Sequence, residues 1–148
     1  MASKRKAAGW AAIAVVCVGG FEGLRQTAYR DPVGIPTVCF GETRGVRMGD
    51  HHTTDECKAM LAGRLEEFND GVNRCVHVQM SDPRRAAVVS FSYNVGVGAF
   101  CKSSFARRLN AGDPDACDEL LKWTKAKGIT FPGLVRRREE ERKLCMEG

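Results

Sequence analysis

The residues best placed to do chemistry are two carboxylic acids near the start of the chain, Glu22 and Asp31. Glu22 directly follows an uncharged run over residues 7–21, so we expect a poorly solvated carboxyl that keeps its proton near neutral pH. Asp31 lies in a segment rich in Gly and Pro, where solvent should keep it ionised. Thr37 follows, with a hydroxyl that can orient a water molecule. A protonated acid facing an ionised carboxylate and a water is the arrangement that hydrolyses a glycosidic bond.

The same pair also has a purely structural interpretation. A chain with 18 acidic residues offers such pairs by chance. A Glu at the end of a helix and an Asp in a turn need no catalytic role. The residue types therefore indicate a candidate acid and a candidate base, which the surrounding elements must bring together.

Those elements are predicted to be mainly helical. A helical pattern continues over residues 21–29 and ends at Asp31-Pro32, because proline cannot extend a helix. From there to Gly49 the chain is rich in Gly and Pro with short β-branched pieces, which predicts a small antiparallel hairpin. Thr53 and Glu56 form a capping box ahead of the next helix. Further helices are predicted from Ser81 to Asn94 with a break at Gly96 and Gly98, from Ser103 or Ser104 to Gly112, from Asp113-Pro114 to Trp123, and from Gly133 to Cys145.

Length and charge narrow the class of protein. The chain has 148 residues, which suits one domain, and its 43% hydrophobic content excludes a disordered chain. With the predicted elements this gives an α+β fold, in which a cleft separates a small antiparallel β-sheet lobe from a mainly helical lobe. The net charge of +5 attracts polyanions such as nucleic acid, anionic lipid or cell wall and does not choose among them. The basic run over residues 136–138 is followed at once by three Glu, which indicates a solvated, salt-bridged helix face and no nucleic-acid site.

The cysteines point to an oxidising compartment. The chain has seven, and none has the close CxxC spacing of a metal or redox site, so structural disulfides explain them better. Cys17 stands apart in the apolar run, either as a small buried hydrophobe or as a thiol with a role. The other six allow fifteen pairings; they are Cys39, Cys57, Cys75, Cys101, Cys117 and Cys145.

The N-terminal run has two interpretations. Lys4, Arg5 and Lys6 precede residues 7–21, which as a helix would span about 22 Å, short of the ~30 Å hydrocarbon core of a bilayer. The run is either a buried first helix of a soluble domain or a signal-anchor that exports and tethers the chain and later leaves the membrane. The charge order and the cysteines favour the signal-anchor. We therefore predict a signal-anchor-like helix in residues 1–21 and a catalytic domain in residues 22–148.

Residues 21–43 carry a specific resemblance. Glu22, eight residues, Asp31, five residues and Thr37 resemble the catalytic signature of the phage-type lysozymes, glycoside hydrolase family 24. The resemblance continues in order along the chain, at residues 92–96, residues 110–113, Trp123, Gly133-Leu134, Arg137-Arg138, Glu141 and Leu144.

The resemblance implies a lysozyme-like fold and a role for each residue. Glu22 would be the general acid, Asp31 would position or activate water, and Thr37 would help to hold that water. The substrate would be the β-1,4 bond between N-acetylmuramic acid and N-acetylglucosamine, cleaved with inversion and without a metal or organic cofactor. Tyr29 and Asn94 are candidate substrate-binding residues.

Within that family, the chain is most similar to secreted endolysins with a signal-arrest-release segment. This implies export to the host periplasm and transient anchoring in the inner membrane through residues 7–21. The tethered enzyme would be inactive, and release would activate a monomer that acts on peptidoglycan. The resemblance also implies the disulfides Cys39–Cys57 and Cys117–Cys145, which leaves Cys75–Cys101 as the third candidate pair.

Two departures and two rival functions accompany this prediction. The family often has Gly in place of Cys39 and His in place of Glu42, and we expect Glu42 to be a structural hydrogen-bond partner in the hairpin rather than a third acid.

One rival function is that of a lytic transglycosylase, which needs Glu22 but can dispense with Asp31 and Thr37. The other is a non-catalytic peptidoglycan-binding protein, against which the presence of all three residues argues.

Overall fold

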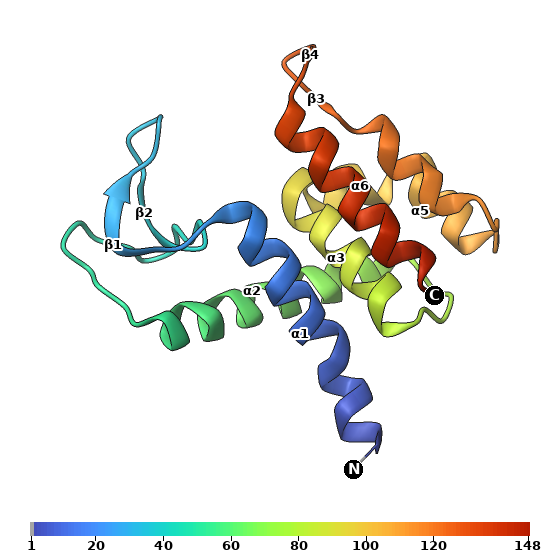
Figure 1. Ribbon diagram of the computed structural model, residues 1–148, viewed down its shortest axis with the longest axis horizontal. Coiled ribbons are helices and arrows are strands. Elements are labelled where there is room, and N and C mark those ends of the chain that lie inside the picture. The colour runs from blue at the N-terminus through green and yellow to red at the C-terminus, as the bar shows by residue number, and fades with distance from the viewer. Residues whose placement is uncertain (1) are drawn as a thin grey trace.

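The computed structural model describes residues 2–148, with side chains from Gly9 onward. Helices make up most of it, and two small antiparallel sheets of two strands each project from the helical body (Figure 1). The predicted α+β class is confirmed. The elements are α1 (Ala2–Glu22), β1 (Arg25–Arg30), β2 (Pro36–Cys39), α2 (Thr54–Cys75), α3 (Asp82–Val95), α4 (Val97–Cys101), α5 (Ser104–Asn110), the 3-10 helix η1 (Ala116–Lys122), β3 (Lys125–Ala126), β4 (Ile129–Thr130) and α6 (Pro132–Met146).

The first helix, α1, runs from the N-terminus into the body of the molecule and leads to the β1–β2 hairpin (Figure 1). Trp10, Ala14 and Val18 are buried at a four-residue spacing, on the face that packs against α3 and α2. The opposite face is open, since Val16 is 78% exposed. The apolar run is thus part of the folded core in this structure. No helix in residues 2–148 is both long enough and apolar enough to span a membrane.

The helix predicted over residues 21–29 is wrong beyond Glu22. α1 ends there because Gly23 takes the left-handed conformation, with φ +77°, and donates its N–H to the carbonyl of Gly19 at 3.0 Å. This is a glycine C-cap, which satisfies a carbonyl at the end of the helix. Gly23 was the sequence signal for the end of the helix, but the helical spacing of apolar residues beyond it favoured a longer helix.

The residues that follow Gly23 form a hairpin instead. β1 pairs antiparallel with β2, and Tyr29 stands opposite Thr37 in the register. Asp31-Pro32 lies in the turn between these strands and not at the end of a helix. The loop before α2 runs along the other side of β1, where the Ala28 N–H donates to the carbonyl of Asp50 at 2.9 Å.

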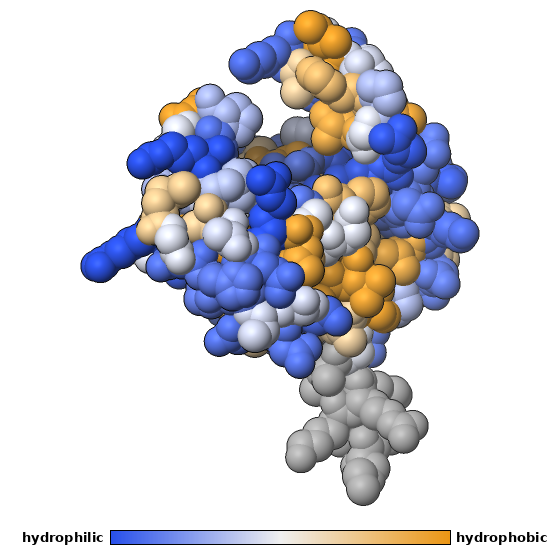
Figure 2. All heavy atoms as spheres, turned by 60° about the vertical axis from the view of Figure 1, so that its left-hand side comes forward, coloured by the Kyte–Doolittle hydropathy of each residue, from blue (hydrophilic) through white to orange (hydrophobic). Residues whose placement is uncertain are grey.

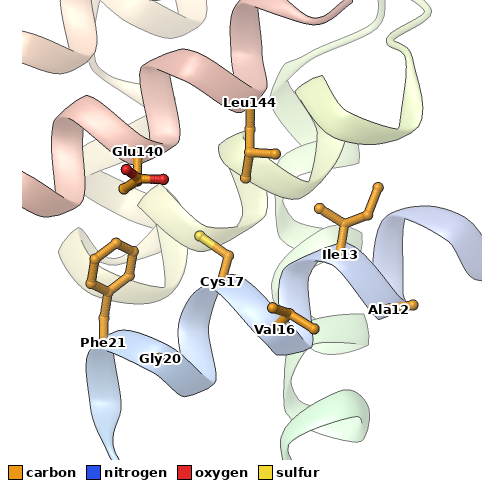
Figure 3. A pocket seen from close by; sticks show the side chains of 8 residues that line it. All are labelled: Ala12, Ile13, Val16, Cys17, Gly20, Phe21, Glu140 and Leu144. Carbon is orange, nitrogen blue, oxygen red and sulfur yellow. The ribbon is translucent and has the colours of Figure 1, made fainter.

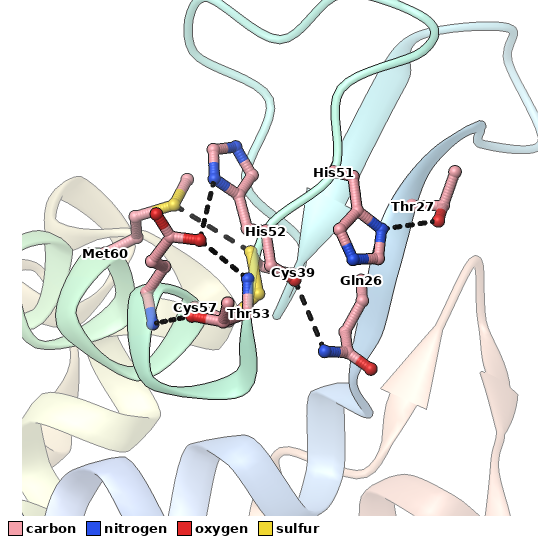
Figure 4. Close-up of a disulfide and its surroundings, with 9 residues drawn as sticks. Gln26, Thr27, Cys39, His51, His52, Thr53, Cys57 and Met60 are labelled. Atoms are coloured by element: carbon pink, nitrogen blue, oxygen red, sulfur yellow. Dashed lines mark hydrogen bonds and ion pairs between the residues drawn. A yellow bond between two sulfur atoms is a disulfide. The ribbon is translucent and has the colours of Figure 1, made fainter.

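Side-chain caps begin the helices of the main body. Thr53 and Glu56 form the predicted capping box at the start of α2, with bonds of 2.7 and 3.1 Å (Figure 4). Ser81 caps α3 and Ser103 caps α5, as the sequence predicts. Each of these hydroxyls accepts a backbone N–H that has no partner inside its helix.

Three details of the later chain differ from the prediction. Gly96 ends α3 with φ +93°, but Gly98 lies inside α4 and breaks nothing. The helix expected from Asp113-Pro114 is a 3-10 helix that begins later, because the Asp113 carboxylate accepts the N–H of Asp115 at 2.8 Å and holds a turn. The β3–β4 hairpin was not predicted.

The core is built around α3, whose residues 86–92 are all buried. Phe91 meets Phe100, Phe105 and Trp123 edge to face, with ring centroids 5.2 to 6.1 Å apart. Such aromatic pairs add to the free energy gained from burying apolar area. α1 and α6 both pack on α3, so the first and last helices of the chain share one central partner.

Three disulfides connect the periphery to this core. One joins β2 to α2 (Figure 4), one joins the end of α2 to α4, and one joins η1 to α6. Among the described residues, Cys17 is the cysteine outside a disulfide, and it is half-buried. The pairs are those named above: Cys39–Cys57, Cys75–Cys101 and Cys117–Cys145.

Candidate active site

The candidate acid, Glu22, is the last residue of α1. Its Oε2 accepts a hydrogen bond from Nη1 of Arg137 at 3.0 Å, and its side chain is 27% exposed. The dry, apolar setting predicted for Glu22 is therefore wrong, because the carboxylate extends past the apolar run to a charged partner on α6. Its Oε1 lies beside the hairpin lobe, where a Cβ added to Gly41 would be 3.4 Å away. Glu22 thus lies between α6 and the hairpin lobe.

The candidate base, Asp31, is fixed by the hairpin turn. Its Oδ1 accepts the N–H of Val33 at 2.9 Å and that of Ile35 at 2.8 Å. The Asp31 N–H in turn donates to the carbonyl of Ile35 at 3.0 Å. These bonds set the orientation of the carboxylate, and the side chain remains accessible because the residue is only half-buried.

Thr37 and Tyr29 lie on the two strands of the same hairpin. Thr37 is buried, and its hydroxyl donates to the carbonyl of Ile35 at 2.8 Å, so an oxygen lone pair remains as an acceptor. Tyr29 is half-buried, with the Arg25 guanidinium 4.2 Å above its ring. The hairpin therefore brings Tyr29, Asp31 and Thr37 together.

Asn94, the other candidate substrate-binding residue, is placed apart from the hairpin, near the end of α3. It is exposed, and its side-chain oxygen accepts a hydrogen bond from Arg138. That bond leaves the Asn94 amide as a donor. Arg138 also donates to the carbonyl of Trp123 at 2.8 Å, so Asn94 belongs to the surroundings of α6.

α6 contributes residues that the sequence prediction missed. Arg137, Arg138 and Glu141 are buried, so the solvated helix face expected for residues 136–141 is wrong for these three, although Arg136, Glu139 and Glu140 are exposed. The available signal was spacing: Arg138, Glu141 and Cys145 recur at the three- and four-residue intervals of a buried stripe. The alternation of three Arg and three Glu hid that stripe.

Two further ionisable side chains, those of Glu42 and Tyr93, lie on the side of the site that faces the hairpin. Glu42 forms an ion pair with Arg64 of α2 at 3.0 Å, which agrees with a structural role for this acid. Tyr93 donates its hydroxyl to the carbonyl of Phe40 at 3.3 Å. Burial, followed by the charges of Glu22 and Glu42, raises the pKa of Tyr93 to about 12. Tyr93 is therefore a neutral donor at physiological pH.

Two hollows flank the end of α1. The larger, about 850 Å³, is bounded by α1, the β3–β4 hairpin and α6 and reaches Arg137. Figure 2 shows the molecule notched between this hairpin and the β1–β2 lobe, where the sequence predicts a cleft. No cluster of His, Cys, Asp and Glu that could hold a metal ion is found in residues 2–148.

The smaller hollow, about 640 Å³, is mainly apolar and lies between α1 and α6 (Figure 3). Cys17 lies at its wall and donates a weak hydrogen bond to Ser90 at 3.7 Å. Burial raises the pKa of the Cys17 thiol above its ordinary value. The structure thus favours a protonated, unreactive thiol in the folded protein.

Comparisons with known proteins show the family and the fold of the chain. The phage lysozyme family matches residues 19–141. A SAR-endolysin of Bacteriophage PS119 is 42% identical over 131 residues, covering 87% of this chain and 78% of the relative. A P22 lysozyme variant superposes with a TM-score of 0.83 at 31% identity, covering 90% of this chain and 94% of that one. The active form of the P1 phage endolysin Lyz gives 0.81 at 26% identity, covering 92% and 84%.

The fold, with a helical body and a small hairpin lobe beside a helix-end glutamate, is that of a lysozyme-like protein. The chain belongs to the phage lysozyme family. Membership supports a glycosidase of the lysozyme type that acts as an endolysin.

Proposed function

We propose that the chain is a muramidase that hydrolyses the β-1,4 bond between N-acetylmuramic acid and N-acetylglucosamine in peptidoglycan and so lyses the bacterial host. The position of Glu22 carries the proposal. Arg137 holds its carboxylate at the end of α1, beside Gly41 and next to the lobe that presents Asp31. In this proposal Glu22 supplies the acid and Asp31 the base from two sides of one site, as hydrolysis of a glycosidic bond requires.

In this mechanism Glu22 donates its proton to the glycosidic oxygen as the bond to the anomeric carbon breaks. Asp31 accepts a proton from a water that adds to that carbon from the opposite face, and the Thr37 hydroxyl holds the water. The product is the inverted anomer, and the two carboxyls need to stand ~6.5–9.5 Å apart to admit the water. The reaction needs no metal or organic cofactor.

The surroundings support these roles. The two turn amides that bind Asp31 keep its carboxylate from rotating, so little ordering is needed in the transition state. Tyr29 offers a ring and a hydroxyl beside Thr37, and Asn94 offers an amide donor. Both suit contacts to the hydroxyl and acetamido groups of the sugars.

The direct test is the clearing of purified peptidoglycan by the parent and by Glu22→Gln, Asp31→Asn and Thr37→Val. General acid catalysis contributes about 10²–10⁴-fold, so Glu22→Gln should lose at least a hundredfold. Glu66→Gln and Asp70→Asn, which alter exposed residues of α2, are matched controls that should retain full activity. Clearing by Glu22→Gln at the parent rate would revive the non-catalytic, wall-binding alternative.

The lytic transglycosylase remains the chemical rival, because it cleaves the same bond without water. Mass spectrometry of the products separates the two activities. Hydrolysis gives a reducing end that contains an added water, whereas a transglycosylase gives an anhydro end. We expect the reducing end, and Asp31→Asn should abolish it.

We also propose that the chain is exported to the host periplasm and is held inactive in the inner membrane through residues 7–21 until release. Relatives named SAR-endolysin support this proposal. The same residues supply Trp10, Ala14 and Val18 to the folded core, so they cannot lie in a bilayer while the enzyme has this fold. Release and folding would be one event, and it would yield an active monomer.

Leu substitutions on the open face of α1 test the tether. Ala12 and Gly20 are exposed in the folded enzyme, so Ala12→Leu with Gly20→Leu raises the apolarity of the run without altering the core. We expect a larger membrane-bound fraction and later lysis, with unchanged activity of the purified protein. Ala111→Leu, at an exposed position outside the run, is the control. Unchanged lysis timing and membrane fraction would contradict the tether.

A further inference from the structure

Glu141 is a fully buried carboxylate whose partners are unusually numerous. Its Oε2 accepts the hydroxyl of Ser90 at 2.6 Å and Nε of Arg137 at 3.2 Å. Its Oε1 accepts Nη1 of Arg138. One negative charge, with 0% of its side chain exposed, is thus shared by two arginines.

Arg137 connects this buried carboxylate to the candidate acid. While Nε binds Glu141, Nη1 binds Glu22 at 3.0 Å and Nη2 binds the carbonyl of Ser90 at 3.2 Å. The guanidinium also lies 5.0 Å from the ring of Phe21. Because its planar fork is held at every nitrogen, Arg137 has one orientation, and so does the carboxylate that it binds.

The charges make this arrangement a problem for a general acid. An arginine close to a carboxyl favours the ionised form, but Glu22 has to be protonated to donate. Arg137 contacts Glu22 directly, and Arg138 brings a second positive charge to Glu141, the same carboxylate that Arg137 binds. Glu141 cancels one of the two positive charges at the point where they meet.

We propose that Glu141 is a positioning residue of the reaction. By neutralising the arginine pair, it lets Arg137 orient Glu22 without driving off the proton that Glu22 must donate. This role rests on the proposed muramidase activity for its purpose, but its electrostatic content can be measured without any turnover.

The other groups that face the cluster do not change this charge count. Tyr93 on α3 is neutral, with a pKa of about 12. Burial raises the pKa of Cys17 on α1, so the thiol also stays neutral. Glu42 is paired with Arg64 of α2 at 3.0 Å. On α6, Arg137, Arg138 and Glu141 form the cluster, and the charges of exposed Glu140 and of Asp31 on the hairpin are the same in every variant below.

A matched pair of variants separates charge from shape. Glu141→Gln keeps the shape and removes the charge, so the alkaline limb of the kcat–pH profile should move to lower pH by about one unit. Glu141→Asp keeps the charge and shortens the side chain, so kcat should fall while the limb stays in place. A merely structural role would lower kcat in both variants and move the limb in neither.

Removing the charge of Arg138 should shift the pH profile in the opposite direction. Arg138→Gln removes one positive charge and should move the limb to higher pH, whereas Arg138→Gln with Glu141→Gln restores the parent balance and should return it. Removing one partner of a buried ion pair is more destabilising than removing both, so the double variant should also fold better than Glu141→Gln alone. Glu141→Gln, Arg138→Gln and the double variant therefore predict a shift to lower pH, a shift to higher pH and no shift. Any one of them that folds tests the proposal.

The same series should be followed by carbon NMR titration of the Glu22 carboxyl in the folded proteins, with folding checked by circular dichroism. This readout separates the two proposals, because a lowered protonation midpoint in Glu141→Gln supports the role of Glu141 even if peptidoglycan is not cleaved. An unmoved midpoint in Glu141→Gln overturns it. Failure of all three charge-altering variants to fold would assign the cluster to stability alone and would also overturn it.

Discussion

Arg137 and Glu22 form an ion pair at 3.0 Å although they stand 115 residues apart in the chain. The contact joins the end of the first helix to the last helix, and it holds the candidate acid against the hairpin lobe. The position of the carboxylate therefore depends on the docking of α1 and α6 on α3. If α1 left the helical body, Glu22 would lose both its contact with Arg137 and its position in the candidate site.

Replacing Arg137 by Lys should lower kcat more than it changes KM. Lysine keeps the charge but lacks the planar fork that binds Glu22, Glu141 and the Ser90 carbonyl at once. Small misplacements of a catalytic group cost up to about a hundredfold, so we expect kcat to fall by about ten- to a hundredfold. Steady-state kinetics on soluble glycan fragments measures the split, with Arg74→Lys on the exposed end of α2 as the control. A parent-like kcat would remove Arg137 from the account.

Gly23 and Gly63 should respond oppositely to alanine. Gly23 has φ +77°, which strains any other residue, so Gly23→Ala should cost about 1–2 kcal/mol of unfolding free energy and loosen the end of α1. Gly63 lies inside α2 with open space around it, so Gly63→Ala should stabilise by about 0.5–1 kcal/mol. Urea unfolding measures both, and equal signs would contradict the C-cap at Gly23.

Local signals predicted the elements that local contacts stabilise. The capping box at Thr53 and the serine caps at Ser81 and Ser103 lie within four residues of the groups they bind, so the sequence pattern locates the starts of α2, α3 and α5. The candidate Glu, Asp and Thr also lie in one short segment, but the resemblance to the phage-type lysozymes singles them out, and their roles stay a prediction.

The errors come from contacts between distant parts of the chain. β1 is a strand because it pairs with β2 and with the loop at Asp50, and neither partner is visible in the residues of β1 themselves. Arg138 and Glu141 are buried because they pair with each other and with groups far away in the sequence, Glu141 with Ser90 and Arg138 with Asn94 and the Trp123 carbonyl. A charge run taken alone is typical of a solvated face, so only the three-dimensional packing reverses that interpretation.

Acid should destabilise the protein through the cluster around Arg108. Hydrogen bonds from Lys122 and then from Arg108 hold the pKa of buried Glu119 below its ordinary value, and Arg108 does the same for Asp113. A carboxyl with a lowered pKa in the fold stabilises above its ordinary value, and this stability is lost as pH falls through the folded pKa. Tm should therefore drop as pH falls below about 5 and should keep falling below pH 4.

Glu119→Gln is the variant that tests this cluster. It should cost about 1–3 kcal/mol at pH 7, because charged hydrogen bonds are lost, and should flatten the fall of Tm with acid. Glu66→Gln should follow the parent at every pH. If Tm of Glu119→Gln falls with pH as steeply as Tm of the parent, Glu119 does not cause the acid sensitivity.

The disulfide Cys117–Cys145 should matter far more to stability than Cys17. It closes a 28-residue loop between η1 and α6, and replacing both cysteines by Ala should cost about 3–4 kcal/mol in the chain-entropy account. Cys17→Ala removes only a half-buried thiol and should cost about 1 kcal/mol or less. Urea unfolding of the oxidised proteins compares them, and the reverse order would contradict the assigned pairing.

The configuration of the first product tests the central claim most directly. Proton NMR of a soluble glycan fragment during the first minutes of cleavage distinguishes the anomers before they equilibrate. Water delivered by Asp31 opposite a proton from Glu22 predicts the α-anomer, with no product from Glu22→Gln. An initial β-anomer, or an anhydro product, would contradict the account.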